Sequence, residues 1–452
     1  MSSEGADAMT QENDDKSALV PRRRFPEFRE AWESLSMSEL YSFKGNNSLP
    51  RDKLNYSGGL LRNIHYGDIH TKFDRHFRSD AGLVPYINDG ESHPTIRPEN
   101  YCMPGDMVFA DASEDMADIG KAIEIIDAGE LPLVSGLHTI LARPNEGSFA
   151  LGFGAYLFSS EGVRKQIQRE AQGAKVLGLS ATRLGNVRLH YPSKRDEQQK
   201  IADCLSSLDE LITAETQKLD ALKTHKKGLM QRLFPRDGEV VPRLRFPEFL
   251  EAGDWSEKPL GEVCNVLQGY GFPEVLQGRR EGKYPFCKVS DISRAVAEKG
   301  GLLDEATNYV GDDDLLKLRA KPIPKGATIF AKIGEALRLN RRAYVNKDCL
   351  IDNNATGLKA IDGVADDYFV HLLSQLIDLN RHCGGAVPSV NKSTLEEIVV
   401  IVPDPDEQRK IAESLSFLDN LITAQSQKIF ALKTHKKGLM QQLFPVMDEV
   451  EA

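Results

Sequence analysis

Long apolar runs are missing from this 452-residue sequence. No stretch approaches the ~20 consecutive apolar residues that a membrane-spanning helix needs. The first residues also lack the basic-then-apolar pattern of a secretory signal. We therefore expect no membrane segment and a cytoplasmic protein.

Motifs that carry chemistry are missing as well. The six cysteines show no C-x-x-C pair, so we expect reduced core thiols and no metal site. There is no N-P-P-Y-like string for a target adenine, and GKA at 120–122 and GKY at 282–284 do not complete a P-loop. GFGAYL at 152–157 lacks the third glycine of a dinucleotide fingerprint. No catalytic residue, metal ligand or cofactor is therefore expected in this chain.

The formal net charge of −10 at first argues against nucleic-acid binding. Its distribution weakens that argument, because residues 1–20 sum to −4, residues 446–452 sum to −3, and only −3 is left for the body. A body with so little net charge has room for one basic face. Both tails are expected to be disordered.

What the sequence does contain is one 40-residue segment twice. Residues 196–235 and 406–445 align without a gap at an offset of 210 and agree at 30 of 40 positions. Apolar residues recur in steps of 3, 4 and 7, which is the 3.5-residue period of a coiled-coil seam. The predicted seam consists of Ile201, Leu205, Leu208, Ile212, Leu219 and Leu222, and then Ile411, Leu415, Leu418, Ile422, Ile429 and Leu432. The aspartate that opens each copy is expected to cap its helix.

Polar residues interrupt each seam at two positions, Glu215 and Lys226 in the first copy and Gln425 and Lys436 in the second. Such positions fix the register of a coiled coil at some cost in stability. About 37 residues at ~1.5 Å each predict helices of about 55 Å. We expect the two helices to pair with each other. The alternative is that each packs separately on its own domain.

A second repeat precedes each helix. PRRRFPEF at 21–28 returns as PRLRFPEF at 242–249, and PGDMVFAD at 104–111 matches KGATIFAK at 325–332. Short apolar runs edged by Gly, Pro, Asn and Asp predict strands and turns around these motifs, with a helix near the end of each domain. The predicted order is a tail at 1–20, an α/β (α+β) domain at 21–195, a helix at 196–235, a second such domain at 242–405, a helix at 406–445 and an acidic tail at 446–452.

The order of these parts favours an antiparallel helix pair. Each helix follows its own domain, so a parallel pair would place both domains at one end. An antiparallel pair would place them at opposite ends, related by a pseudo-two-fold axis, which is the symmetry with which proteins read spaced half-sites on DNA. If such a pair reads DNA, the two half-sites should differ, because the two domains differ in sequence.

The RFPEF entries, DEQ-x-KIA helix starts, LITA centres and KTHKKGLMQ-x-LFP exits resemble those of specificity subunits of type I restriction–modification systems, over about residues 21–445. The resemblance implies two target-recognition domains, each reading half of a bipartite double-stranded DNA site, and a coiled coil that sets the gap. It also implies two modification subunits that methylate adenine, and restriction subunits that translocate and cleave DNA. S-adenosylmethionine, ATP and Mg would then belong to those partners.

Basic and amide side chains in the domains are the candidates for DNA contact. Arg and Asn read base edges in bidentate fashion, and Lys mostly holds phosphates. The candidates are Lys72, Arg75, Arg78 and Arg183 in the first domain, and Lys332, Arg338, Asn340, Arg341, Arg342, Asn391 and Lys392 in the second. A solvated charged face is their alternative role.

The basic cluster at 223–227, repeated at 433–437, also has two interpretations. Its cations suit a helix C-terminus, and they also suit contact with phosphate or with an acidic partner. For the whole chain, the alternative function is a structural adaptor whose coiled coil assembles protein partners. DNA binding that falls steeply with salt would separate the two functions.

Overall fold

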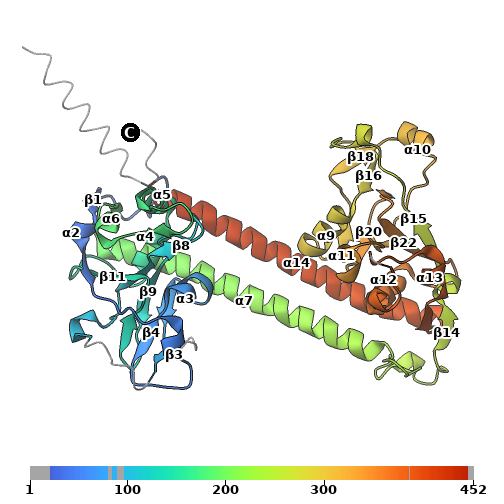
Figure 1. The fold of residues 1–452 in the computed structure, drawn as a ribbon, viewed down its shortest axis with the longest axis horizontal. Coiled ribbons are helices and arrows are strands. Elements are labelled where there is room, and N and C mark those ends of the chain that lie inside the picture. The colour runs from blue at the N-terminus through green and yellow to red at the C-terminus, as the bar shows by residue number, and fades with distance from the viewer. Residues whose placement is uncertain (1–20, 80–83, 89–95, 386, 446–452) are drawn as a thin grey trace, which may run out of the picture. The chain divides into compact units, whose positions relative to one another are not determined.

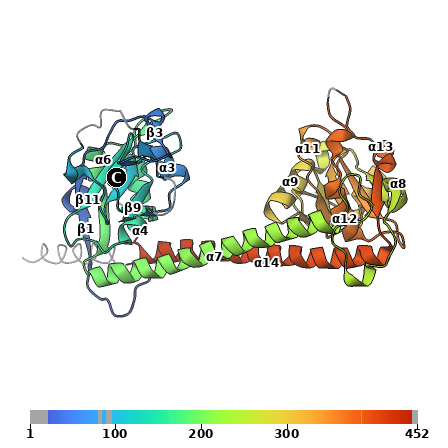
Figure 2. The ribbon, with the colours of Figure 1, turned by 90° about the horizontal axis from the view of Figure 1, so that it is seen from below.

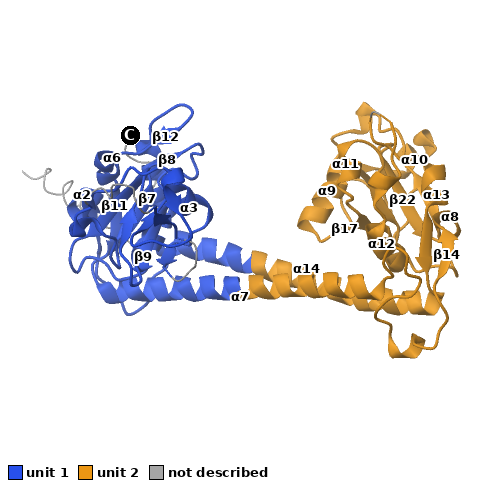
Figure 3. Cartoon of the chain, turned by 60° about the horizontal axis from the view of Figure 1, so that its bottom comes forward, with its two compact units in different colours: residues 1–213, 431–452 blue, residues 214–430 orange. Residues whose placement is uncertain are grey.

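The computed structural model describes residues 21–79, 84–88, 96–385 and 387–445. Both predicted tails lie outside the described residues. The described chain forms two compact units, unit 1 from residues before 214 together with those from 431 on, and unit 2 from residues 214–430 (Figures 1 and 3). The division passes through both long helices, α7 (Arg195–Leu233) and α14 (Pro405–Leu443). Each unit therefore holds one domain and one segment of each helix.

The main sheet of unit 1 has the order β2-β11-β7-β9-β5 within the described residues. Its strands are β2 (Tyr41–Lys44), β11 (Thr139–Pro144), β7 (Met107–Ala110), β9 (Ala122–Asp127) and β5 (His76–Arg78). β5 runs parallel to β9, and the other neighbours are antiparallel. All four residues of β7 are buried, and they alternate between two hydrophobic cores. A strand covered on both faces reads as a continuous apolar run, as β7 does.

Smaller elements complete unit 1. A second sheet has the order β10-β4-β6-β3, and two strand pairs are β1-β13 and β12-β8. These strands are β10 (Leu133–Ser135), β4 (Arg62–Ile64), β6 (Tyr86–Ile87), β3 (Leu54–Asn55), β1 (Trp32–Ser36), β13 (Arg188–Pro192), β12 (Leu177–Gly178) and β8 (Ala112–Ser113). The helices are α2 (Met37–Leu40), α3 (Tyr66–Thr71), α4 (Phe153–Ser159), α5 (Glu161–Glu170) and α6 (Ala181–Gly185), with 3-10 turns η1 (Arg51–Lys53) and η2 (Pro98–Asn100).

Unit 2 repeats this plan. Its main sheet has the order β15-β22-β19-β20-β17, so β19 occupies the place of β7. The strands of this sheet are β15 (Cys264–Gln268), β22 (Ala355–Ala360), β19 (Thr328–Ala331), β20 (Ala343–Val345) and β17 (Leu302–Leu303). The strands of unit 2 outside this sheet are β18 (Asn308–Val310), β16 (Tyr284–Cys287), β21 (Leu350–Ile351), β14 (Ser256–Pro259) and β23 (Val399–Val402). The helices are α8 (Leu260–Val263), α9 (Val289–Glu298), α10 (Asp312–Leu318), α11 (Glu335–Arg338), α12 (Asp367–Leu376) and α13 (Lys392–Glu397), with η3 (Pro247–Phe249), η4 (Glu274–Leu276) and η5 (Leu379–Arg381).

The α7 and α14 segments run antiparallel within each unit. In unit 1, Ile201 near the start of α7 shares a core with Leu443 at the end of α14, and Asp209 further along α7 contacts Lys436. Residue numbers therefore increase along one helix in the direction in which they decrease along the other. In unit 2 the same holds for Glu215 with Gln425 and for Lys226 with Asp419. The predicted α/β domains and antiparallel coiled coil are confirmed.

The domain of unit 1 lies on one side of its two helix segments (Figure 2). Its core takes in the start of α7 and the end of α14, whereas the core of unit 2 takes in the end of α7 and the start of α14. Among the described helices, none combines the length and apolar character that crossing a membrane requires.

Candidate nucleic-acid interface

The arginine of each RFPEF segment locks a long helix to its domain. Arg24 donates to both carboxylate oxygens of Glu197 at 2.6 Å, and Arg245 does the same to Glu407 at 2.8 and 2.7 Å. The two glutamates are only 1% and 2% exposed. Each contact is therefore a buried bidentate ion pair, the strong form of this interaction. The arginine of each RFPEF segment and the glutamate near the start of each long helix therefore have a structural role.

The residue after each glutamate, Gln198 or Gln408, secures the domain to the helix start. Each accepts one backbone N–H and donates to two backbone carbonyls of its own domain. The prediction that Asp196 and Asp406 cap the helices was wrong. The helices begin at Arg195 and Pro405, so both aspartates lie inside the first turn, where their charge still suits the helix dipole.

The lysines of the seam meet carboxylates of the opposite helix. The same three-part contact occurs in both units, with Lys436, Asp209 and Tyr156 in unit 1 and Lys226, Asp419 and Tyr368 in unit 2. The lysine comes from one helix, the aspartate from the other, and the tyrosine from α4 or α12 of the domain. Sequence reasoning missed the tyrosines because they lie outside the repeated segment.

The apolar seam is most deeply buried where a domain covers it. Ile201, Leu205, Ile411 and Leu415 are at most 1% exposed, because they reach the domain cores. The remaining predicted residues are either nearly buried (Leu418, Ile422, Ile429) or partly exposed (Leu208, Ile212, Leu219, Leu222, Leu432). The helices therefore pack both on each other and on the domains, which combines the two arrangements weighed from sequence.

Lys72 lies in a surface cluster that sequence reasoning did not find. Lys72 and Arg51 contact Asp68 at 3.0 and 2.6 Å, and their cationic groups lie 5.0 and 5.8 Å from the ring centroid of Tyr56. Tyr56 is 47% exposed. Cations beside an exposed aromatic ring suit phosphate and base contact. Only the fold brings Tyr56 and Arg51 to Lys72, so spacing gave no signal.

The other candidates of unit 1 differ in their exposure and in the contacts that they make within the protein. Arg75 lies 5.3 Å from the Tyr156 ring centroid and 4.0 Å from Asp209. Arg78 is exposed at the end of β5. Arg183 in α6 donates at 3.1 Å to the carbonyl of Glu170, so part of its role is to hold α6 against the end of α5.

Equivalent strand ends carry opposite charges in the two units. Asp111 follows β7 and lies 3.2 Å from His138, whereas Lys332 follows β19 and donates to Gln268 at 3.0 Å. Burial raises the pKa of Asp111. The backbone carbonyls of both residues accept from the loop that precedes α6 or α13. The same framework therefore presents an acceptor in one unit and a donor in the other.

The structure brings several candidates of unit 2 together. The carbonyl of Lys332 accepts from Val390, which places Lys332 beside the loop of Asn391 and Lys392. Asn391 caps α13 by accepting from the Thr394 N–H at 2.8 Å, and the Lys392 ammonium lies 3.4 Å from Glu396.

The remaining four candidates of unit 2 follow one another around α11. Arg338 is exposed and Arg341 partly exposed, whereas Arg342 is only 5% exposed. The Arg342 guanidinium lies 4.3 Å from the Phe330 ring centroid and donates to the carbonyl of Ser374 and to Asn340. Burial lowers its pKa to about 9. Arg342 therefore holds the domain together and is not available to DNA, contrary to the sequence-based proposal.

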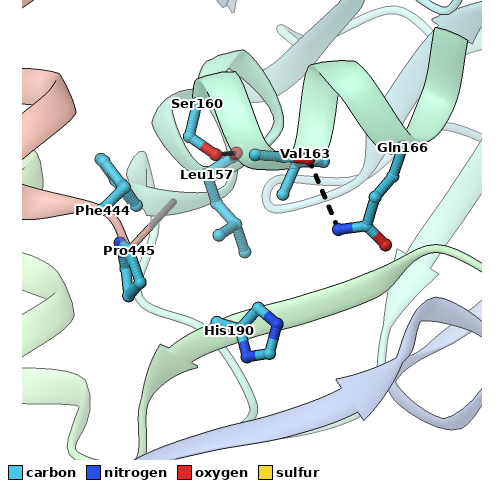
Figure 4. A pocket seen from close by; sticks show the side chains of 8 residues that line it. Leu157, Ser160, Val163, Gln166, His190, Phe444 and Pro445 are labelled. Atoms are coloured by element: carbon cyan, nitrogen blue, oxygen red, sulfur yellow. Dashed lines mark hydrogen bonds between the residues drawn. The ribbon is translucent and has the colours of Figure 1, made fainter. Parts of the chain in front are cut away.

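No group of three or more His, Cys, Asp or Glu residues within the described chain is arranged to hold a metal ion. A cavity beside His190, Phe444 and Pro445 measures about 10 Å³, the size of roughly one water (Figure 4). This cavity reflects packing at the end of α14.

A family model described as the type I restriction modification DNA specificity domain matches residues 79–224 and 252–434. The chain belongs to this family. Its two matched regions are thereby DNA specificity domains, and the chain is the DNA specificity subunit of a type I restriction–modification system.

Individual relatives agree with this membership. A putative type I restriction enzyme specificity subunit, MjaX of Methanocaldococcus jannaschii, is 25% identical over 357 residues, which cover 75% of this chain and 77% of the relative. The crystal structure of an S subunit from M. genitalium has the same fold, with a TM-score of 0.60 at 16% identity over 95% of this chain and all of that one. A chain from a study of type I system assembly has a TM-score of 0.53 at 14% identity, covering 92% and 98%.

Proposed function

We propose that this specificity subunit reads an asymmetric bipartite target on double-stranded DNA. The domain at 21–195 reads one half, and the domain at 242–405 reads the other. The helices at 196–235 and 406–445 hold the two readers at a set spacing. One observation carries the proposal. The contacts that join each domain to the helices are repeated in both units, whereas the residues at the ends of the matching strands β7 and β19 differ.

The scaffold contacts are the same in both units. The bidentate Arg–Glu pair, the hydrogen bonds of Gln198 or Gln408 to the domain backbone, and the Lys–Asp–Tyr contact each occur twice. By contrast, the matching strand ends carry Asp111 in one unit and Lys332 in the other. An aspartate suits the amino donor of cytosine, and a lysine suits the acceptors of guanine. A common frame with different readers fits two unlike half-sites.

The proposal extends to the partners. Two modification subunits that carry S-adenosylmethionine bind the repeated helix surfaces, and restriction subunits supply ATP- and Mg-dependent cleavage. This chain acts in the cytoplasm as the non-catalytic reader and assembly frame, without a cofactor of its own. The repeated surface supports the first part, because 30 of 40 helix positions are identical.

Replacing one domain tests the division of labour. Residues 242–405 are exchanged for the equivalent domain of a relative, at boundaries that leave both helices intact. One half of the methylated target should change and the other half should stay the same. The matched exchange of residues 21–195 should change the opposite half. If either exchange alters both halves, the domains are not independent readers.

The alternative role as a protein-binding adaptor makes a different prediction. A DNA reader binds its target with an affinity that falls steeply as salt rises, by ~0.9 logarithmic units per phosphate contact for each tenfold rise in salt. An adaptor shows no preference for the target duplex. Binding that is equal for target and scrambled duplexes would support the adaptor.

A further inference from the structure

Unit 1 contains a groove where its domain meets the end of α14. The groove measures about 520 Å³ and is lined by Arg75, Ser159, Glu161, Lys433, Lys436, Lys437, Met440 and Gln441. The five α14 residues stand at positions i, i+3, i+4, i+7 and i+8, so they occupy one face of the helix. The domain supplies Arg75 before β5 and the junction of α4 and α5.

The charge of this groove is mostly positive and only partly compensated. Lys436 is paired with Asp209, and Glu161 is held by Lys165 at 2.9 Å and by Gln441 at 3.1 Å. Lys433 and Lys437 are exposed, and neither makes a hydrogen bond or ion pair with the residues that the structure describes. The cations are therefore available for an anionic ligand.

Arg75 adds to this surplus of positive charge. Its Nη1 atom is buried and has no hydrogen-bond partner among the described residues, and its Nε atom lies 4.0 Å from Asp209, the one carboxylate that also pairs with Lys436. The Arg75 and Lys436 cations both lie 5.3 Å from the centroid of the Tyr156 ring. Burial and the proximity of Arg75 lower the pKa of Lys436. An anion in the groove would relieve this mutual repulsion.

Unit 2 lacks the arginine at the equivalent position. In unit 1 the carbonyl of Arg75 accepts from Glu124 of β9, and in unit 2 the carbonyl of Gly301 accepts from Tyr344 of β20, both at 2.7 Å. Gly301 therefore occupies the place of Arg75. The helix lysines recur as Lys223 and Lys227, but no arginine stands at this position of the second domain.

We propose that this groove binds backbone phosphates of DNA next to the half-site read by the first domain. Lys433 and Lys437 supply mobile point charges, and Arg75 supplies a planar donor from the domain itself. The contact is one-sided, because unit 2 has glycine in place of Arg75. It anchors the duplex without reading bases. The proposal rests on the function proposed above and adds the place where that function holds the backbone.

The test measures how DNA binding depends on salt for the full chain and for two matched variants. The first variant carries Lys433→Ala and Lys437→Ala in the groove. The second carries Lys223→Ala and Lys227→Ala at the repeated positions. The probe is a labelled duplex that contains the target sequence identified by methylation mapping. A duplex of scrambled sequence serves as the reference. All four lysines are exposed, so each substitution leaves the core intact.

The groove variant should lower the slope of log affinity against log salt by about 1.8, at ~0.9 for each lost phosphate contact. The repeated variant should leave the slope unchanged, and both variants should keep the same target bases. Adding Arg75→Gln to the groove variant should lower the slope further, by up to about 0.9.

Three results would overturn the proposal. An unchanged slope in the groove variant would show that its lysines do not meet phosphate. Equal losses in both lysine variants would show a property of helix ends that does not depend on Arg75. A groove variant that keeps its slope but no longer retains a modification subunit would assign the groove to an acidic protein face. If the unsubstituted chain shows no preference for its target duplex, the proposed function itself fails.

Discussion

Lengthening both helices at their centre should lengthen the gap in the DNA target. Four residues of helix-forming sequence are inserted after Ala214 and four more after Ala424. Each insertion adds about 6 Å at ~1.5 Å per residue, and four residues keep the seam nearly in phase as a stutter. One base pair occupies about 3.4 Å along the duplex. The preferred spacer should therefore grow by roughly one to two base pairs while the specific bases stay the same.

The contacts of the helices indicate that the fold tolerates this change. Asp209 and Lys436 both remain within unit 1, and Lys226 and Asp419 both remain within unit 2. The insertions separate Glu215 from Gln425, which now donates to it at 2.5 Å. Losing that contact and the neighbouring Lys428–Glu215 ion pair removes only a small part of the ~5–15 kcal/mol that stabilises a domain.

Methylation mapping in cells that carry the variant and its modification partner gives the spacer directly. The control inserts four residues after Ala214 alone. That change shifts one helix against the other, so the two Lys–Asp contacts can no longer form together, and activity should be lost. If the double insertion stays active with the original spacer, the helices do not set the spacing.

Three further predictions address the scaffold and its partners. Arg245→Met leaves the Glu407 carboxylate buried without its partner, so urea unfolding should show unit 2 destabilised by about 3–5 kcal/mol, and a loss below ~1 kcal/mol would contradict the anchoring role. Burial raises the pKa of Glu124 from 4.5 to about 7, so this carboxyl should contribute up to about 3 kcal/mol to the stability of unit 1 below pH 4.5, and that contribution should be lost as the pH rises through about 7. Glu124→Gln should remove this pH dependence in urea unfolding, and an unchanged dependence would refute the assignment. Because the helix surface occurs twice, native mass measurement of the saturated complex should show two modification subunits for one copy of this chain, and a one-to-one complex would refute that stoichiometry.

The long helices and the domain order could be predicted because their signals are local or repeated. A 3.5-residue period needs no knowledge of distant contacts, and the repeat shows that the segment is used twice. The bidentate Arg24–Glu197 contact joins residues that are 173 positions apart. Both residue types could be seen in repeated motifs, but only the fold shows that they meet.

The DNA candidates were harder to predict because exposure depends on tertiary packing. Arg341 and Arg342 are neighbours in sequence, but Phe330 and the end of α12 enclose only the second. Tyr56 and Arg51 lie beside Lys72 only because the chain folds there, and the spacing of these residues in the sequence does not show it. Lys433 and Lys437 had two interpretations from sequence, and their position opposite Arg75 favours phosphate contact.

Sequence-resolved methylation mapping of cells that carry this chain with its modification partner would show whether the chain contains two unlike readers. We expect a single modified motif with two short specified segments that differ from each other and are separated by a fixed unspecified spacer. A genome with no modified motif, or with a symmetric motif, would contradict the assignment of two unlike readers to this chain.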